Sequence, residues 1–134
     1  MTTQPDNKAV LRRVAEECFN NGNLAVLDEI FASQDSINDK RQFIPALRTA
    51  FPDLHCTIEE LIEEGDKVAL RATMSGTNAG AWQGRPPTGR KISWQLMVFN
   101  RFEGGKIVEE WVNIDGLNIL EQLGSTFQPA AMTY

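Results

Sequence analysis

The chain has 134 residues, a length typical of one domain, so we expect a single domain over residues 1–134. Its composition is ordinary for a folded protein, with 42% hydrophobic and 23% charged residues. The net charge of −5 disfavours nucleic acids and anionic membrane surfaces as partners, because both attract clustered basic residues. The start of the chain is polar and no apolar run is long enough to cross a bilayer, so the expected location is the cytoplasm.

The first part of the chain predicts three helices. Apolar residues recur at helical spacing over residues 7–20 and again over residues 24–31. A third apolar stripe covers residues 43–51, but Pro45 interrupts it, because proline lacks an amide donor and restricts the residue before it. We therefore expect either a kinked helix here or a helix whose first turn begins at Pro45.

After Pro52 the hydrophobic period changes from helical to alternating, which is typical of strands. The expected strands cover residues 54–63, 68–77, 92–102 and 106–115, and a short helix follows over residues 117–123. Helices packed on such an antiparallel meander make an α+β domain. The last two strands carry large apolar residues on both faces, so we expect the helices to cover one face and a second subunit, in a homodimer, to cover the other.

The hairpin between the last two strands sets which residues share a face. If Gly104-Gly105 is a two-residue turn, Val98 faces Trp111, Leu96 faces Asn113 and Trp94 faces Asp115. Directly opposite residues lie on the same face of a sheet. The residues predicted to line one surface are then Trp94, Leu96, Val98, Trp111, Asn113 and Asp115. A bulge at Gly105 would instead shift the pairing by one residue and exchange these partners.

Asp115 has two interpretations. A carboxylate among aromatic rings loses hydration, which disfavours its charged form, raises its pKa and makes it a better general base near neutral pH. Asp115 also lies directly before Gly116-Leu117, where its side chain can cap the last helix. The residues alone favour the capping role over the catalytic one.

The cysteines and the single histidine indicate neither a disulfide nor a metal site. Cys18 and Cys56 are far apart in the sequence and each lies among apolar residues, so two buried free thiols are expected. His55 is the only histidine, and no Cys or His pair has the spacing of metal ligands. A lone strand histidine of this kind is more often structural than catalytic.

Arg71 and Trp82 each have a structural and a functional interpretation. Arg71 is the only charge inside its strand, and it needs a carboxylate partner such as Glu59 or Asp115. It could also orient Asp115 or hold a substrate carbonyl. Trp82, in a loop rich in Gly and Pro, could form a lid over a pocket or cover an edge of the core.

Several segments of the chain carry motifs that occur together in one family. They are Ala50-Phe51-Pro52-Asp53-Leu54, Gly65 to Arg71, Gly76 to Gly80 with Gly84 to Gly89, the hairpin from Phe99 to Asp115, and Gln122-Leu123-Gly124. Their order and spacing resemble those of the SnoaL-like polyketide cyclase family. The resemblance implies a cone-shaped nuclear-transport-factor-2-like fold, in which N-terminal helices pack on a curved antiparallel sheet.

The resemblance also implies a reaction. In characterised cyclases of this family an Asp at the end of the last strand acts as acid and base, and Asp115 holds that position here. It would remove a proton beside a ketone or ester of a small apolar substrate, and an intramolecular aldol closure would follow. The family chemistry uses no metal and no organic cofactor.

This chain departs from many relatives at two histidine positions. Asn78 stands where they carry a His in the loop, and residues 34–38 lack the His that follows their second helix. Asn78 or Asn113 could donate a hydrogen bond to an oxyanion, but a neutral amide cannot shuttle a proton. The cyclase or isomerase hypothesis therefore competes with two others: a non-catalytic small-molecule binding protein, and a dimeric interaction module with a vestigial pocket.

Overall fold

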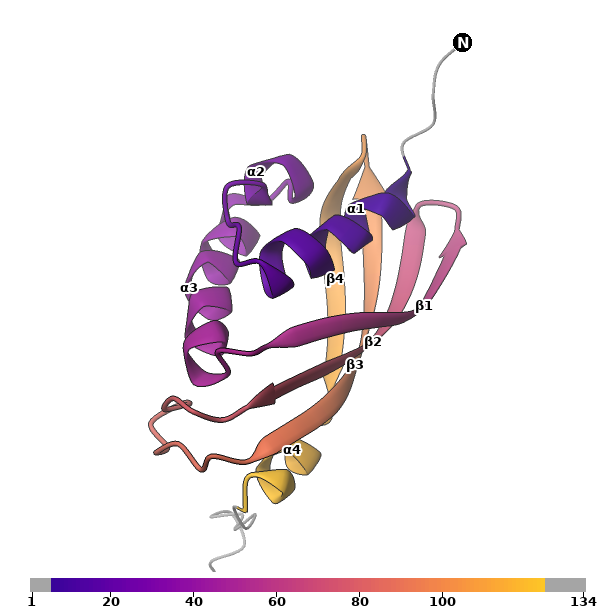
Figure 1. Cartoon of the computed structure of the whole chain (residues 1–134). Coiled ribbons are helices and arrows are strands. Elements are labelled where there is room, and N and C mark those ends of the chain that lie inside the picture. The colour runs from indigo at the N-terminus through magenta and orange to yellow at the C-terminus, as the bar shows by residue number, and fades with distance from the viewer. Residues whose placement is uncertain (1–5, 125–134) are drawn as a thin grey trace, which may run out of the picture.

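The computed structural model describes residues 6–124 and shows a curved antiparallel sheet whose one face is covered by the N-terminal helices (Figure 1). The helical elements are α1 (Asn7–Arg13), η1 (Val14–Asn20), α2 (Leu27–Ile30), α3 (Gln34–Ala50) and α4 (Gly116–Gln122). The strands are β1 (His55–Glu64), β2 (Lys67–Thr77), β3 (Lys91–Glu103) and β4 (Lys106–Ile114), in the order β1-β2-β3-β4. The α+β prediction is confirmed. Over the described range, no helix is both long and apolar enough to span a membrane.

The first predicted helix forms as α1 followed directly by η1, a π-helical segment. Asp6 caps the start of α1 by accepting a hydrogen bond from the Ala9 amide at 3.1 Å. At the other end, the Asn20 carboxamide accepts from the Cys56 amide at 2.6 Å and donates to the Cys56 carbonyl at 3.1 Å. One side chain therefore satisfies both backbone groups of a β1 residue and attaches the helix to the sheet.

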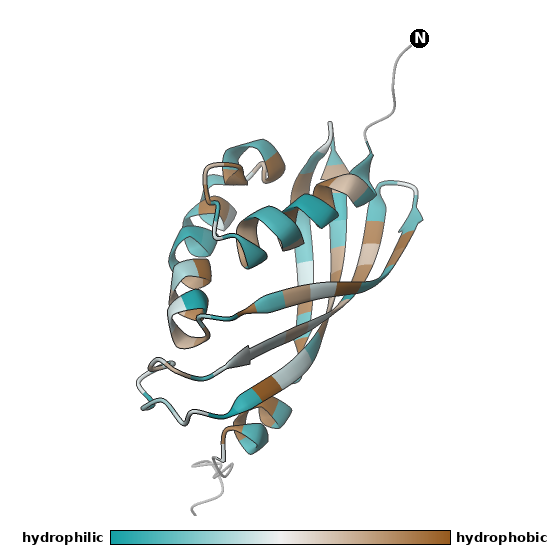
Figure 2. Ribbon diagram, viewed as in Figure 1, coloured by the Kyte–Doolittle hydropathy of each residue, from teal (hydrophilic) through white to brown (hydrophobic). Residues whose placement is uncertain are grey.

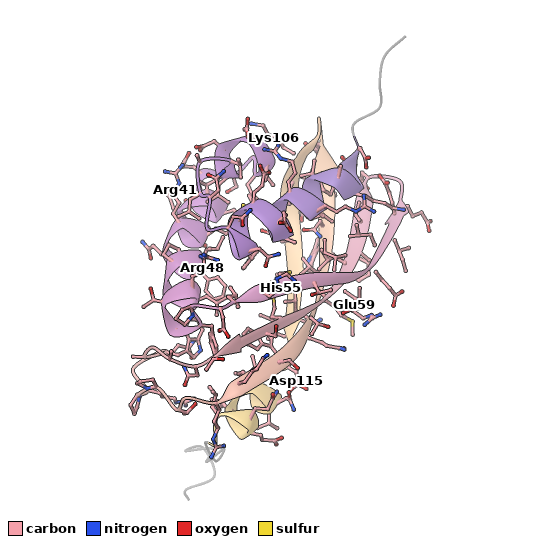
Figure 3. The ribbon with its side chains drawn as sticks, viewed as in Figure 1. Arg41, Arg48, His55, Glu59, Lys106 and Asp115 are labelled. Atoms are coloured by element: carbon pink, nitrogen blue, oxygen red, sulfur yellow. The ribbon has the colours of Figure 1, made fainter. Side chains whose placement is uncertain are left out.

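Helix α3 begins at Gln34, well before the start expected at Pro45, so the prediction of a helix starting at Pro45 is wrong. Proline inside a helix removes one hydrogen bond to the carbonyl four residues earlier, here Arg41. Both residues are exposed, so water can replace the missing donor. Arg48, on the same helix, donates through Nη1 to the carbonyls of Phe19 at 2.6 Å and Asn20 at 2.8 Å, which ties α3 to the end of η1 (Figure 3).

The hairpin between β3 and β4 starts in the predicted register and then shifts. Glu103 pairs with Lys106 and Phe102 with Ile107, as a two-residue Gly104-Gly105 turn requires, but Arg101 pairs with Glu109. Val108 is left without a partner and forms a β-bulge. The predicted pairing beyond this point is therefore wrong by one residue.

The bulge decides which β4 residues face the helices. Val98 lies opposite Val112 and Leu96 opposite Ile114, on the inner face, whereas Trp111 pairs with Phe99 on the outer face. Hydrophobic residues occur along all four strands (Figure 2). Those facing inward pack against the helices in two core clusters. The clusters include Cys18 of η1 and Cys56 of β1, which are free and buried as predicted.

We predict that Asn20→Ala lowers the free energy of unfolding by about 1–3 kcal/mol, because it leaves both backbone groups of Cys56 without their side-chain partner. Urea unfolding measures the change. Asn21→Ala is the matched control, since Asn21 is exposed. Equal stability of the two variants would contradict the structural role of the Asn20 carboxamide.

Candidate functional site

A cavity of about 600 Å³ lies between the N-terminal helices and the inner face of the sheet. Trp94, Leu96 and Val98 line it from β3, as alternating inward residues of one strand. Trp82 lines it from the loop between β2 and β3, where its ring meets Phe43 of α3 edge to face at 6.0 Å between centroids. The walls are mainly apolar, so the cavity suits a largely apolar guest.

Polar residues interrupt the apolar wall, and three of them lie close together; the full set is Asp39, Lys40, Gln83, Arg85, Asn100 and Glu110. Lys40 of α3 and Glu110 of β4 line the cavity and form an ion pair, with 2.5 Å between Nζ and Oε1. Asn100 of β3 also lines the cavity and lies directly opposite Glu110 in the sheet. The wall therefore offers a cation, an anion and a neutral amide close together.

These three residues did not stand out in the sequence. Glu110 adjoins Glu109, a pattern that predicts solvated or ion-paired positions for both, and Lys40 lies in a polar stretch of α3. Asn100 gave the one usable signal, because it is a polar residue at an inward position between Val98 and Phe102. Identifying its partner Glu110 also required the register beyond the Val108 bulge.

Asp115 lies where β4 leads into α4 (Figure 3). Its side chain is exposed and caps α4, since Oδ1 accepts a hydrogen bond from the Asn118 amide at 3.0 Å. Its two chain neighbours, Ile114 and Gly116, line the cavity, whereas Asp115 itself does not. The structure thus shows the capping role and places the carboxylate beside the cavity and outside its lining.

Trp111 and Asn113 do not line the cavity. After the Val108 bulge both lie on the outer face of the sheet, opposite Phe99 and Met97. The placement of these two residues beside Asp115 on a common inner surface was wrong for that reason.

Arg71 lies on the outer face as well and does not line the cavity. It pairs with Glu60, at 2.9 Å from Nε and 2.7 Å from Nη2 to the same Oε1. Neither predicted partner, Glu59 nor Asp115, is the one observed. The cause is an irregularity in β1, where the pairing passes from Ile58 to Glu60 and leaves Glu59 out of the ladder.

Asn78 holds the loop between β2 and β3 together and does not line the large cavity. It is buried, donates through Nδ2 to the Gly80 carbonyl at 2.9 Å, and accepts at Oδ1 from the amide and hydroxyl of Thr88 at 2.9 and 3.0 Å. With its oxygen and amide engaged by the loop, Asn78 stabilises the segment that presents Trp82 to the cavity.

The cysteine and histidine side chains do not form a nucleophilic or metal site in the described residues. Cys56 lines the cavity, but burial raises the pKa of its thiol to about 11, so the thiol stays protonated near neutral pH. His55 is exposed at the start of β1 (Figure 3). Within residues 6–124, no three side chains that could ligate a metal lie together.

Comparison with known proteins relates the whole domain to one family. The family model described as SnoaL-like polyketide cyclase matches residues 9–123. The chain is similar to the solved structure of TsrD from Streptomyces laurentii, with 25% identity over 94% of this chain and 100% of that chain and a TM-score of 0.82. It is also similar to AclR from Streptomyces galilaeus, a candidate hydroxylase, with 27% identity over 96% and 88% of the two chains and a TM-score of 0.78.

A third similar structure is IdmH from Streptomyces antibioticus, a candidate polyketide cyclase, with 27% identity over 89% of this chain and 99% of that chain and a TM-score of 0.75. No curated protein matches the chain. The family model spans nearly all described residues, and the predicted nuclear-transport-factor-2-like fold is confirmed by these structures. The chain therefore belongs to the SnoaL-like polyketide cyclase family.

Proposed function

We propose that this protein binds a small, largely apolar carbonyl compound in the cavity and catalyses a cyclase or isomerase reaction by proton transfer. The observation behind the proposal is the cavity of about 600 Å³, walled mainly by apolar side chains with a few polar groups among them. Such a cavity is the usual form of a small-molecule site. A filled interior would have favoured the interaction module instead.

Asp115 is the proposed acid and base. It would take a proton from the carbon beside a ketone or ester, and the resulting enolate would close onto a second carbonyl. The position of Asp115 between two cavity-lining residues, Ile114 and Gly116, supports this role. To reach a guest, the carboxylate has to leave the Asn118 amide and turn toward the cavity.

A non-catalytic binding protein is the second candidate function. The observation that favours it is the exposure of Asp115, because its carboxylate caps α4 and lies outside the cavity lining. Asn78, which stands at a family histidine position, is engaged by its own loop and offers no proton relay.

We predict that Asp115→Asn slows proton transfer by about 10²–10⁴-fold and leaves the fold intact. Asparagine caps a helix about as well as aspartate, so the variant removes basicity and keeps the hydrogen bond to Asn118. Exchange of the α-protons of 2-tetralone in D₂O, followed by NMR, measures the rate, and thermal unfolding checks the fold.

Full exchange activity in Asp115→Asn would overturn the assignment of Asp115. Asp115→Ala is the comparison variant, since it loses both the base and the cap and should lose about 1 kcal/mol of stability as well. If the wild-type protein binds 2-tetralone and does not accelerate its exchange, the binding function is supported over the catalytic one.

We also propose a homodimer formed through the outer face of the sheet. Met97 and Phe99 of β3 and Trp111 of β4 are 56%, 54% and 48% exposed on that face, and Phe99 and Trp111 are paired neighbours. Large apolar side chains gathered on neighbouring strands are typical of a surface covered by a partner. A second copy buries the same residues from both sides.

We predict that Phe99→Lys converts the dimer to a monomer, because each interface would then bury two unpaired ammonium groups. Light scattering after size exclusion at micromolar concentration measures the molar mass. Gln42→Lys adds the same charge at an exposed position of α3, which lies on the opposite side of the sheet, and should remain dimeric. A monomeric wild-type protein would contradict the proposal.

A further inference from the structure

The ion pair on the cavity wall is held by several contacts. Besides its 2.5 Å contact with Glu110, Lys40 donates to the Ser36 hydroxyl at 3.1 Å, and its ammonium lies 4.2 Å from the centre of the Phe31 ring. The Ser36 hydroxyl lies 3.3 Å from the same Glu110 oxygen. The side chains of Lys40 and Glu110 are only 17% and 21% exposed. The pair is therefore a fixed part of the wall rather than a mobile surface contact.

Two acceptor oxygens beside this pair are open. Asn100 is 1% exposed, and its Nδ2 donates to the Val68 carbonyl at 3.3 Å, but its Oδ1 accepts no hydrogen bond from any described residue. The contacts of Glu110 all use Oε1, so its Oε2 is likewise without a donor from the described part of the chain. Neither oxygen is among the fully buried side-chain atoms that lack a partner, so both remain accessible, and a guest that supplies a donor would satisfy them.

We propose that Lys40, Asn100 and Glu110 form a polar anchor that binds a hydroxyl group of the guest, such as that of a phenol or an alcohol. This inference rests on the proposed binding function of the cavity. A hydroxyl donates to an open oxygen of Asn100 or Glu110 and accepts from the Lys40 ammonium. An ether or ketone accepts only, and leaves both oxygens without a donor.

The charges at the anchor favour a neutral group. The positive charge of Lys40 is compensated by Glu110, and Asp39 and Arg85 add one carboxylate and one guanidinium elsewhere in the cavity lining. At the anchor itself, a carboxylate on the guest would meet the like charge of Glu110 in a poorly hydrated place, which disfavours it. The anchor therefore selects a hydroxyl over both an anion and a pure acceptor.

The test compares the binding of four flat probes by calorimetry: naphthalene, 2-naphthol, 2-methoxynaphthalene and 2-naphthoate. We expect 2-naphthol to bind about tenfold more tightly than 2-methoxynaphthalene, as one hydrogen bond to a charged or buried acceptor provides. We expect 2-naphthoate to bind most weakly. Equal affinity for 2-naphthol and 2-methoxynaphthalene would overturn the anchor. Tightest binding of 2-naphthoate would overturn it as well.

Two variants test which residues cause the preference for a hydroxyl group. Lys40→Met with Glu110→Met removes both charges together and leaves no buried ion unpaired, and Asn100→Leu removes the open amide oxygen. The double variant should bind 2-naphthol and 2-methoxynaphthalene within about twofold of each other. The matched control is Arg41→Met with Asp28→Leu, which removes an exposed ion pair away from the cavity and should keep the preference.

The possible outcomes distinguish failure of the polar anchor from failure of the proposed binding function. A hydroxyl preference that survives in the double variant overturns the anchor while leaving the binding function in place. Failure of naphthalene itself to bind the wild-type protein removes the binding function, and the anchor with it. Should Asn100→Leu fail to fold, the double variant decides alone.

Discussion

One unpaired residue, Val108, determines what the cavity and the outer surface are made of. Up to the bulge, β4 follows the pairing that a two-residue turn sets. Beyond it, each β4 side chain lies on the face opposite to the one that this pairing would give. Glu110 and Val112 consequently face the helices, while Trp111 joins Phe99 on the outside. This shift determines the position of Glu110 in the polar anchor, the shape of the cavity, and which apolar side chains lie on the outer face.

The sequence predicted those elements whose signals are local. Alternating strands and the Gly104-Gly105 turn were correct, because turn chemistry and period act over a few residues. The bulge was missed since nothing in Val108 marks it: it is a good strand residue without a glycine beside it. The early turns of α3 were missed because Ile37 is their only buried apolar residue. Because of the register error, Trp111 and Asn113 were placed on the wrong face.

The protein contains two carboxylates whose surroundings suit different tasks. Asp115 is exposed and caps a helix, whereas Glu110 is held on the wall by Lys40 and Ser36. In our account the first transfers a proton at the edge of the cavity and the second helps to orient the guest. An apolar cavity of this size forgoes packing contacts whenever it is unfilled. A guest that fills it recovers those contacts, which links binding to the stability of the fold.

The central claim is that the cavity accepts an apolar guest and orients it by a hydroxyl group. A crystal structure with 6-bromo-2-naphthol tests it most directly, because anomalous scattering locates the bromine without ambiguity. The account predicts a bromine peak inside the cavity near Trp94 and Leu96, with the hydroxyl about 3 Å from Asn100 Oδ1 or Glu110. A bromine found only on the outer face, or a cavity closed by its own side chains, would contradict the account.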